Sequence, residues 1–473
     1  MIVAAALSAS GPTLRRPFLL GLLAGAVYFG GTLYWVVAVM TTYGGLATPV
    51  AALVGILLVV YLALYPACFA WLIAASVRRW SITAVWVSPF LWVGGEWVRS
   101  WMLNGFPWVM LGSSQASVIP IVQAASVVGV YGLSWIVALV GTAAAMLALT
   151  RRPRHRWAAL AVVMFVGLIA TLGMLRVARG TLTQTGTVLR VGMLQGNVAQ
   201  GQKWNPAFRD MILTRYLELS RRVIGSGAGL VVWPEASTPF LFNLEAAMAQ
   251  PIRRLAVETR TPFLIGTDEL ERREGHDSYY NAAVLVGADG RSRATYKKMW
   301  LVPFGEYVPF KRILFFVGPL VEAVSDFTPG GEPVVFDLDG HRISVAICYE
   351  SIAPWISRAF VRRGSQLLAT ITNDAWFGRS SAAYQHFEQG AVRAVEEGRY
   401  VVRAANTGIS GAVDPYGRVL ERTPLFETTT AMVDVRLLDG RTIYSYIGDV
   451  VAWVSAAIMG FTIVLMVPRR RRR

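Results

Sequence analysis

Three side chains in this sequence have the chemistry of a covalent catalyst: Glu235, Lys298 and Cys348. Cys348 ends an apolar run typical of a β-strand and precedes a helical pattern. At such a turn the helix dipole and free backbone N–H groups favour a nucleophilic thiolate. Glu235 also ends an apolar run and suits a general base, while Lys298 enters an apolar loop from which it can stabilise an oxyanion. Each also has an ordinary structural interpretation: a capping or surface glutamate, a solvated loop lysine and a packed cysteine.

An α/β domain is predicted to position these residues. From about residue 188 onward, short β-branched runs alternate with amphipathic stretches, which is the pattern of a layered α/β domain. The predicted strands are 188–195, 230–233, 262–266, 282–286, 343–348, 367–372 and 400–404. Helical patterns cover 205–224 and 352–363.

The rest of the chain is apolar enough to be embedded in a membrane. Hydrophobic residues make up 54% of the chain and charged residues only 16%, against roughly a quarter charged in soluble proteins. Residues 17–77 and 100–150 contain no Asp, Glu, Lys or Arg. At roughly 20 residues per span, we expect about six transmembrane helices, about five before residue 180 and one at the C-terminus. Glu96 and Arg99, near the end of one span, are expected to pair with each other or to line a lipid-access face.

Arginines beside the apolar stretches predict which side of the membrane each segment faces. Most of the net charge of +16 comes from residues that flank these stretches. They are Arg15, Arg16, Arg78, Arg79, Arg151, Arg152, Arg154, Arg156 and Arg469 to Arg473. By the positive-inside rule, these segments are cytoplasmic and the nearly neutral segment 180–449 lies outside, with Arg176 and Arg179 on the disfavoured side. The charge is therefore a topology signal, and we expect no nucleic-acid partner.

The cysteines and histidines argue against a disulfide and a metal site. Cys68 lies in an apolar span and Cys348 in the outer domain. They are not expected to form a disulfide. An unpaired thiol in an oxidising compartment is a liability, so we expect Cys348 to be buried or to have a function. The four histidines show no metal-ligand spacing and no glycine-rich phosphate loop is present, so we expect no metal and no cofactor. His386 offers a rival Cys–His hydrolase pairing with Cys348, which would leave the glutamate and lysine motifs unexplained.

Four motifs of mixed chemistry surround the candidate residues. They are Trp-Pro-Glu at 233–235, Leu-Val-Pro-Phe-Gly-Glu at 301–306, Ile-Cys-Tyr-Glu at 347–350 and Asn-Asp-Ala-Trp-Phe-Gly at 373–378. With them the chain resembles the nitrilase superfamily, whose active site is Glu, Lys and Cys in this order, and within it the apolipoprotein N-acyltransferases. The resemblance covers nearly the whole chain. It implies an α-helical transmembrane bundle plus an α/β nitrilase-like domain, an α-β-β-α sandwich, outside the membrane. The expected domains are transmembrane helices at 1–179, the catalytic domain at 180–447, and a closing helix with a basic tail at 448–473.

The resemblance implies a role for each member of the trio. Cys348 would be the nucleophile, Glu235 the general base and Lys298 the cation on the oxyanion side. Lys298 matches better than the neighbouring Lys297 by its spacing to Glu306. Glu306 is similar to the family's second active-site glutamate, which would hold the lysine or tune the base.

Further residues of the chain resemble the family's substrate pocket. They are Trp204, Tyr349 and Glu350, for which packing or loop support is the alternative. Trp376 and Phe377 are expected to be structural rather than catalytic.

The implied reaction is a ping-pong acyl transfer. Glu235 takes the thiol proton, and the thiolate attacks an ester carbonyl of a phospholipid, typically phosphatidylethanolamine. Lys298 and the Tyr349 backbone N–H stabilise the oxyanion, a lysophospholipid leaves, and a thioester remains on Cys348. The N-terminal amine of a diacylglyceryl-cysteine on an apolipoprotein then attacks the thioester and becomes an amide. A membrane setting fits, because moving acyl chains through water costs about 0.8 kcal/mol per CH₂.

The resemblance also implies a location and partners. We expect a multi-pass protein of the bacterial inner membrane with its catalytic domain on the periplasmic side. It is expected to act as a monomer among membrane lipids, with a phospholipid as acyl donor and a diacylated lipoprotein as acceptor. The family usually has more spans than we count, and the missing pair would fall at the N-terminus. Two alternatives remain: a membrane-tethered amidase that releases ammonia from a small amide, and a non-enzymatic lipid-binding scaffold that keeps the fold.

Overall fold

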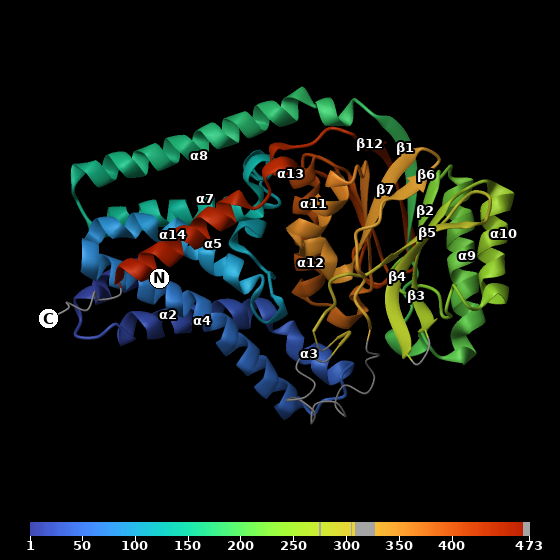
Figure 1. The fold of residues 1–473 in the computed structure, drawn as a ribbon, viewed down its shortest axis with the longest axis horizontal. Helices are drawn as coiled ribbons and strands as arrows, with labels where there is room; N and C mark the ends of the chain where they lie inside the picture. Colours follow the sequence, from blue (N-terminus) through green and yellow to red (C-terminus); the bar gives the residue numbers. More distant parts are fainter. Residues whose placement is uncertain (274–275, 304, 308–326, 467–473) are drawn as a thin grey trace. The chain divides into compact units, whose positions relative to one another are not determined.

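Figure 1 shows the computed structural model, which describes residues 1–273, 276–303, 305–307 and 327–466. Its internal contacts divide the chain into two compact units. We call residues 1–38, 47–179 and 447–473 the helical unit, and residues 39–46 and 180–446 the α/β unit. Two short helices, α3 (Trp35–Thr42) and α13 (Ile443–Ile447), run from one unit into the other.

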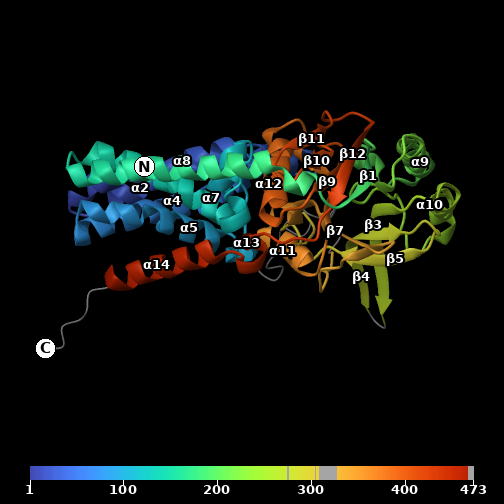
Figure 2. The ribbon, with the colours of Figure 1, turned by 90° about the horizontal axis from the view of Figure 1, so that it is seen from above.

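The helical unit is built from apolar helices. Among the described residues, four helices are long and apolar enough to cross a membrane. They are α2 (Arg15–Leu33), α4 (Thr48–Trp80), α7 (Ala125–Leu149) and α8 (Pro153–Arg179). The shorter helices are α1 (Ile2–Leu7), α5 (Ser88–Arg99), α6 (Ile119–Val122) and α14 (Val450–Met466). Helix α2 packs along α4, and α14 packs along α5 (Figure 2).

The two spans expected between residues 80 and 150 are one long helix and one short one. Helix α5 has 12 residues and rises only about 18 Å, less than the roughly 30 Å of a bilayer core. It ends because the following segment is non-helical, with positive φ at Leu103, Asn104 and Gly105. The structure therefore has four long apolar helices before residue 180, where about five spans were expected.

The two charged residues near the end of α5 bind this non-helical segment. Glu96 Oε1 accepts the backbone N–H of Leu111 at 2.7 Å, and Arg99 Nη1 donates to the carbonyl of Trp108 at 3.0 Å. Non-helical backbone at membrane depth is tolerated only where such partners replace water. Glu96 and Arg99 therefore bind backbone groups of this segment. Pairing with each other was one of the two expectations for these residues.

The basic segments of the helical unit lie at one end of it. Arg78, near the end of α4, donates to the carbonyls of Ala9 and Gly11, which precede α2. Trp86, shortly after α4, donates to His155 at the start of α8 at 3.3 Å. The arginine-rich segments before α2, after α4 and between α7 and α8 therefore share a side, as the positive-inside argument requires.

In its described residues, the α/β unit holds two six-stranded sheets. The first sheet has the order β12-β1-β2-β3-β4-β5 and the second β11-β10-β9-β8-β7-β6. The strands of the first are β1 (Thr187–Gln195), β2 (Leu230–Val232), β3 (Phe263–Arg273), β4 (His276–Val286), β5 (Ser292–Lys297) and β12 (Thr429–Leu437). Those of the second are β6 (Phe336–Leu338), β7 (His341–Ile347), β8 (Leu367–Thr372), β9 (Val401–Ala405), β10 (Gly411–Val413) and β11 (Val419–Arg422).

The two sheets face each other, and helices cover their outer faces. Val232 of β2 and Val345 of β7 belong to one core between the sheets. Val231 points to the other face of β2 and packs with α9 (Arg209–Gly225) and α10 (Ala246–Thr259), as the period of two in a strand requires. Helices α11 (Pro354–Arg362) and α12 (Ser381–Glu397) lie on the opposite side of the strands (Figure 1). The predicted α-β-β-α sandwich is confirmed.

Every strand predicted from an apolar run is present, and β8 has the predicted bounds. Strands β3 and β4 continue into polar residues and form a long hairpin, paired from Phe263↔Val286 to Arg273↔His276. The sequence does not predict β5, β6, β10, β11 or β12, because these strands are short or present polar side chains to solvent. All four residues of β11, for example, are exposed.

Candidate active site

Glu235 follows β2 and lies in a buried turn, where it is 6% exposed. Its Oε1 accepts from Asn281 Nδ2 at 2.7 Å, and its Oε2 accepts the backbone N–H of Asn373 at 2.7 Å. The backbone carbonyl of Glu235 accepts from Lys203 Nζ at 3.1 Å. These bonds orient both carboxylate oxygens and tie the turn to three other segments of the α/β unit.

Lys298 directly follows β5 and joins two carboxylates. Its Nζ lies 2.8 Å from Glu306 Oε1 and 3.5 Å from Glu235 Oε1, and the residue is 1% exposed. Burial alone lowers the pKa of Lys298, but the Glu306 and Glu235 carboxylates outweigh burial and raise that pKa above its usual range. Asn281 Nδ2 also donates to Glu306 Oε1, at 2.9 Å. Lys298 is therefore a permanent cation between two acids.

Glu306 also holds the loop that follows the lysine. Its Oε2 accepts the backbone N–H of Val302 at 2.9 Å, and its own N–H donates to the Val302 carbonyl at 2.9 Å. Residue 304 and residues 308–326 lie outside the described part of the chain. Within the described part, Glu306 is the second carboxylate in contact with Lys298.

Cys348 stands at a strained turn between β7 and the short 3₁₀ helix η9 (Cys348–Ile352). Its φ of +53° lies in the left-handed region, which is uncommon for a residue with a side chain. Its carbonyl accepts from Ser351 Oγ at 2.9 Å and lies 3.0 Å from His386 Nε2. These contacts hold a conformation that costs on the order of 1–3 kcal/mol.

The thiol of Cys348 is neutral at rest. Burial and the Glu235 carboxylate raise the pKa of the thiol well above its usual range, although Lys298 and Thr372 lower it. The helix dipole was expected to lower this pKa, but burial and Glu235 determine its direction. Helix η9 has only five residues, and its dipole is small beside the cost of burying a thiolate. The thiol therefore needs a base before it can act as a nucleophile.

Glu350 connects the lysine loop to the cysteine turn. It is fully buried, and its Oε1 accepts from the Tyr296 hydroxyl at 2.8 Å and from the backbone N–H of Met299 at 2.7 Å. Its Oε2 accepts the backbone N–H of Ile347 at 2.8 Å. Burial raises the pKa of Glu350 to about 7. Glu350 therefore supports the lysine loop and the cysteine turn from a buried position, because it binds backbone groups of both.

The aromatic residues singled out from the sequence lie in different environments. The Tyr349 ring is buried and packs on Trp300, with 4.6 Å between ring centroids. Trp376 packs on Tyr43, with 5.1 Å between ring centroids. Trp204 is 46% exposed, so the structure does not bring it into the buried cluster of acids and lysine.

Three polar residues of the buried site escaped sequence analysis: Lys203, Asp268 and Asn281. Asp268 and Asn281 are register partners on β3 and β4, so their side chains lie on the same face of the sheet. Burial raises the pKa of Asp268 to about 7, and burial lowers the pKa of Lys203. The signal that could have found them is a polar residue inside, or next to, an otherwise buried strand.

A second buried network lies beneath the cysteine turn. His386 Nδ1 lies 3.0 Å from Asp374 Oδ1, and Arg403 Nη2 donates to Asp374 Oδ2 at 2.8 Å. Burial raises the pKa of Asp374, but Arg403 and His386 outweigh it and hold that pKa below its usual range. The His386 ring also packs edge-on against Phe377. The contact of His386 with the cysteine backbone makes it a support of the turn, unlike the base of a Cys–His hydrolase.

Comparisons with known proteins agree with both parts of the chain. The carbon-nitrogen hydrolase family model matches residues 190–443, and the model of the apolipoprotein N-acyltransferase N-terminal domain matches residues 1–143. The apolipoprotein N-acyltransferase of Geobacter metallireducens is 40% identical over 463 residues, which are 97% of this chain and 88% of that protein. This chain belongs to the apolipoprotein N-acyltransferase family.

The apolipoprotein N-acyltransferase of Methylococcus capsulatus is 34% identical over 461 residues, covering 96% of this chain and 88% of that protein. A solved amidase from Nesterenkonia is 21% identical, with a TM-score of 0.40 over 53% of this chain and 92% of its own. The family predicted from the four motifs is confirmed by the full-length relatives.

The helical unit of this N-acyltransferase family member contains a cavity of about 370 Å³. Its lining is mostly apolar and includes Glu96 and Arg99. Some lining residues are buried, such as Leu91, whereas Leu64 and Ile463 are 41% and 43% exposed. The cavity therefore opens from the interior of the helical unit to its apolar outer surface.

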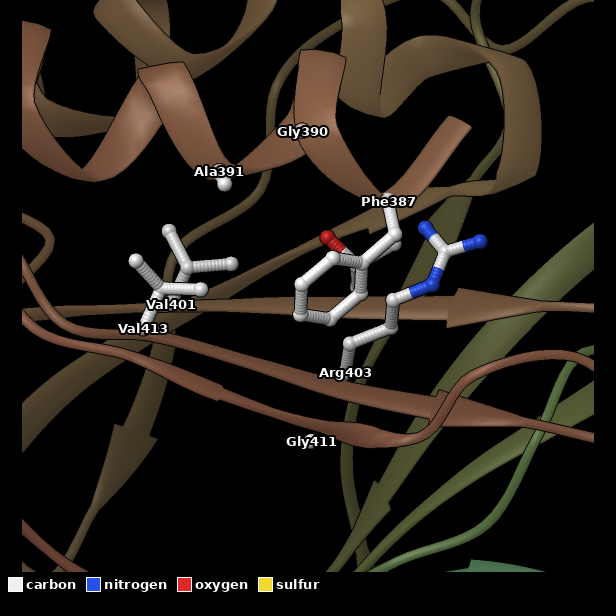
Figure 3. Close-up of a pocket in the computed structure, with 8 residues that line it drawn as sticks. Phe387, Gly390, Ala391, Val401, Arg403, Gly411 and Val413 are labelled. Carbon is white, nitrogen blue, oxygen red and sulfur yellow. The ribbon is translucent and has the colours of Figure 1, made fainter. Parts of the chain in front are cut away.

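The α/β unit has a much smaller void, between α12 and strands β9 and β10 (Figure 3). Phe387 and Arg403 are among the residues that line it. Its volume of about 10 Å³ is room for roughly one water molecule. This void cannot hold an acyl chain, so it is not a substrate pocket.

Proposed function

We propose that this protein transfers a fatty acyl group from a phospholipid to the N-terminal amine of a diacylglyceryl-cysteine on an apolipoprotein. The observation that carries this proposal is the buried Lys298, joined to the Glu235 and Glu306 carboxylates and acting electrostatically on the Cys348 thiol. The class of acceptor, an apolipoprotein, is taken from the names of the relatives. Phosphatidylethanolamine is the proposed acyl donor.

In the first half-reaction Glu235 takes the proton of the Cys348 thiol, and the thiolate attacks an ester carbonyl of the phospholipid. The raised thiol pKa supports this step, because a neutral thiol makes the base necessary. Lys298 and the backbone N–H of Tyr349 stabilise the tetrahedral oxyanion. A lysophospholipid leaves with the proton returned by Glu235, and the acyl group stays on the sulfur as a thioester.

In the second half-reaction the amine of the lipoprotein attacks the thioester. Glu235 takes a proton from the amine, the C–N bond forms as the C–S bond breaks, and the departing Cys348 thiolate takes the proton back from Glu235. Glu306 keeps Lys298 in place in both steps through the contact of 2.8 Å. Trp204, exposed beside the buried Lys203, is proposed to contact substrate, with Tyr349 and Glu350 shaping the site behind it.

The site is proposed to lie on the periplasmic side of a bacterial inner membrane. The shared side of the arginine-rich segments supports this, because the chain then leaves α8 on the opposite side of the membrane. Arg176, on that disfavoured side, is accommodated by a hydrogen bond to Gln123. The apolar cavity of the helical unit is proposed to admit lipid chains from the bilayer.

Mass spectrometry of the full-length protein after incubation with phosphatidylethanolamine tests the proposal. A fatty-acyl thioester on Cys348 is the expected result, absent in Cys348→Ala and present in the matched control Cys68→Ala. Ammonia release from small amides with no acyl-enzyme would overturn the proposal in favour of an amidase.

A further inference from the structure

The Cys348 thiol has a hydroxyl neighbour that the reaction described above does not use. Thr372 is the last residue of β8, which pairs with β7 in parallel, with Ile371 opposite Ile347. The next residues along the two strands are Thr372 and Cys348, so the two residues stand at neighbouring strand ends, and the Thr372 hydroxyl lowers the pKa of the thiol. Thr372 Oγ1 also donates to Asp374 Oδ1 at 2.8 Å. The hydroxyl therefore stands between the sulfur and a buried acid.

The group that receives the Thr372 proton in the resting site follows from the number of protons available. A threonine hydroxyl has one proton to donate. Asp374 remains ionised, since Arg403 and His386 hold its pKa low against the effect of burial, and an ionised carboxylate only accepts hydrogen bonds. The Thr372 proton is therefore directed at Asp374 as long as the thiol is neutral.

Once the thiol loses its proton, the sulfur becomes a charged hydrogen-bond acceptor beside the Thr372 hydroxyl. We infer that the Thr372 hydroxyl turns from Asp374 to the Cys348 sulfur when Glu235 takes the thiol proton, and that Thr372 is a catalytic residue that stabilises the thiolate. The proton itself moves only from sulfur to Glu235. When the thioester forms, the sulfur loses its charge and the hydroxyl turns back to Asp374. The inference rests on the proposed role of Cys348 as nucleophile.

Asp374 keeps other polar partners when it loses the hydrogen bond from Thr372. Arg403 Nη2 donates to its other oxygen at 2.8 Å, and His386 Nδ1 lies 3.0 Å from Oδ1. The sulfur also stays within reach of Thr372, because Ser351 and His386 hold the carbonyl of the cysteine turn. The buried network thus supports a hydroxyl that can serve two acceptors in turn.

Alkylation of the thiol by iodoacetamide measures this effect without lipid substrates. The experiment uses the full-length protein in detergent with Cys68→Ala. It compares Thr372→Val, which replaces the hydroxyl with a methyl group, with Thr372→Ser, which keeps the hydroxyl. A hydrogen bond to a charged group is worth about 1.5–3 kcal/mol, so Thr372→Val should slow alkylation at pH 8 by about tenfold or more. Its rate should reach the wild-type value only at higher pH. Thr372→Ser should restore most of the rate.

Two results would overturn the inference: an unchanged pH profile of alkylation in Thr372→Val, or equal slowing in the valine and serine variants, which indicates packing alone. If the valine variant does not fold, Thr372→Ala provides the hydroxyl-free variant. Acyl-enzyme formation is measured on the same samples. Hydroxyl-dependent alkylation without any acyl-enzyme would contradict the proposed function and leave the role of Thr372 standing.

Discussion

The carboxylate of Glu350 accepts the backbone N–H of Met299 at 2.7 Å. Its other oxygen accepts the backbone N–H of Ile347 at 2.8 Å, so one buried side chain joins the residue after Lys298 to the residue before Cys348. The distance between the proposed cation and the proposed nucleophile therefore depends on Glu350. A catalytic geometry that must hold to within about 0.5 Å needs such support.

Replacing Glu350 with glutamine should disturb this geometry. A carboxylate accepts at both oxygens, whereas an amide presents one acceptor and one donor, so at least one of the bonds to Tyr296, Met299 and Ile347 is lost. Glu350→Gln should slow acyl-enzyme formation by about tenfold or more and lower stability by about 1–3 kcal/mol. Tyr296→Phe, which removes a single donor, is the milder control. A glutamine variant with wild-type rate and melting temperature would show that Glu350 does not set the geometry.

Of the two adjacent lysines, only Lys298 should be needed for acylation. Lys298→Met removes the cation between two buried carboxylates, and loss of an oxyanion donor typically costs about 100- to 1000-fold in rate. Lys297→Met is the matched control, since Lys297 is part-exposed and pairs with Glu271. The measurement is the rate of acyl-enzyme formation by mass spectrometry. Equal losses in both variants would contradict the assignment.

The apolar strands and the residues at their ends could be predicted from the sequence, because a buried β-strand needs a run of β-branched residues and Glu235 and Cys348 directly follow such runs. The supporting residues could not. Asn281 lies on the polar half of β4, just before the apolar run 282–286 begins, and its contacts depend on pairing with β3. The break after α5 was missed because it depends on Glu96 binding backbone groups of a distant turn.

Asp268 should make stability depend on pH. Burial raises its pKa from 3.8 to about 7, so the folded protein holds a proton between these values that the unfolded chain has lost. The free energy of unfolding therefore falls as pH rises through this range. Asp268→Asn should reduce the difference in melting temperature between pH 5 and pH 8. If Asp268→Asn kept the same difference in melting temperature as the wild type, Asp268 would not titrate in this range.

Asp434→Asn is the control for this experiment. Asp434 is exposed and pairs with Arg190, whose hydrogen bond lowers its pKa. Its titration lies below pH 5, so its removal should leave the pH 5 to pH 8 difference unchanged. The buried Glu350 and Glu397, both with a pKa raised to about 7, should keep part of the dependence in the Asp268 variant.

The proposed sidedness predicts which surface positions a membrane-impermeant maleimide can reach in cells whose outer membrane has been opened. Glu218, exposed on α9, and Arg151, exposed between α7 and α8, are suitable positions, introduced one at a time as Glu218→Cys or Arg151→Cys in a chain with Cys68→Ala and Cys348→Ala. Glu218→Cys should react in such cells, and Arg151→Cys only after the inner membrane is permeabilised, because the proposed sidedness puts the arginine-rich segments in the cytoplasm. The reverse pattern would place the α/β unit in the cytoplasm, where a lipoprotein acceptor on the periplasmic face could not reach Cys348.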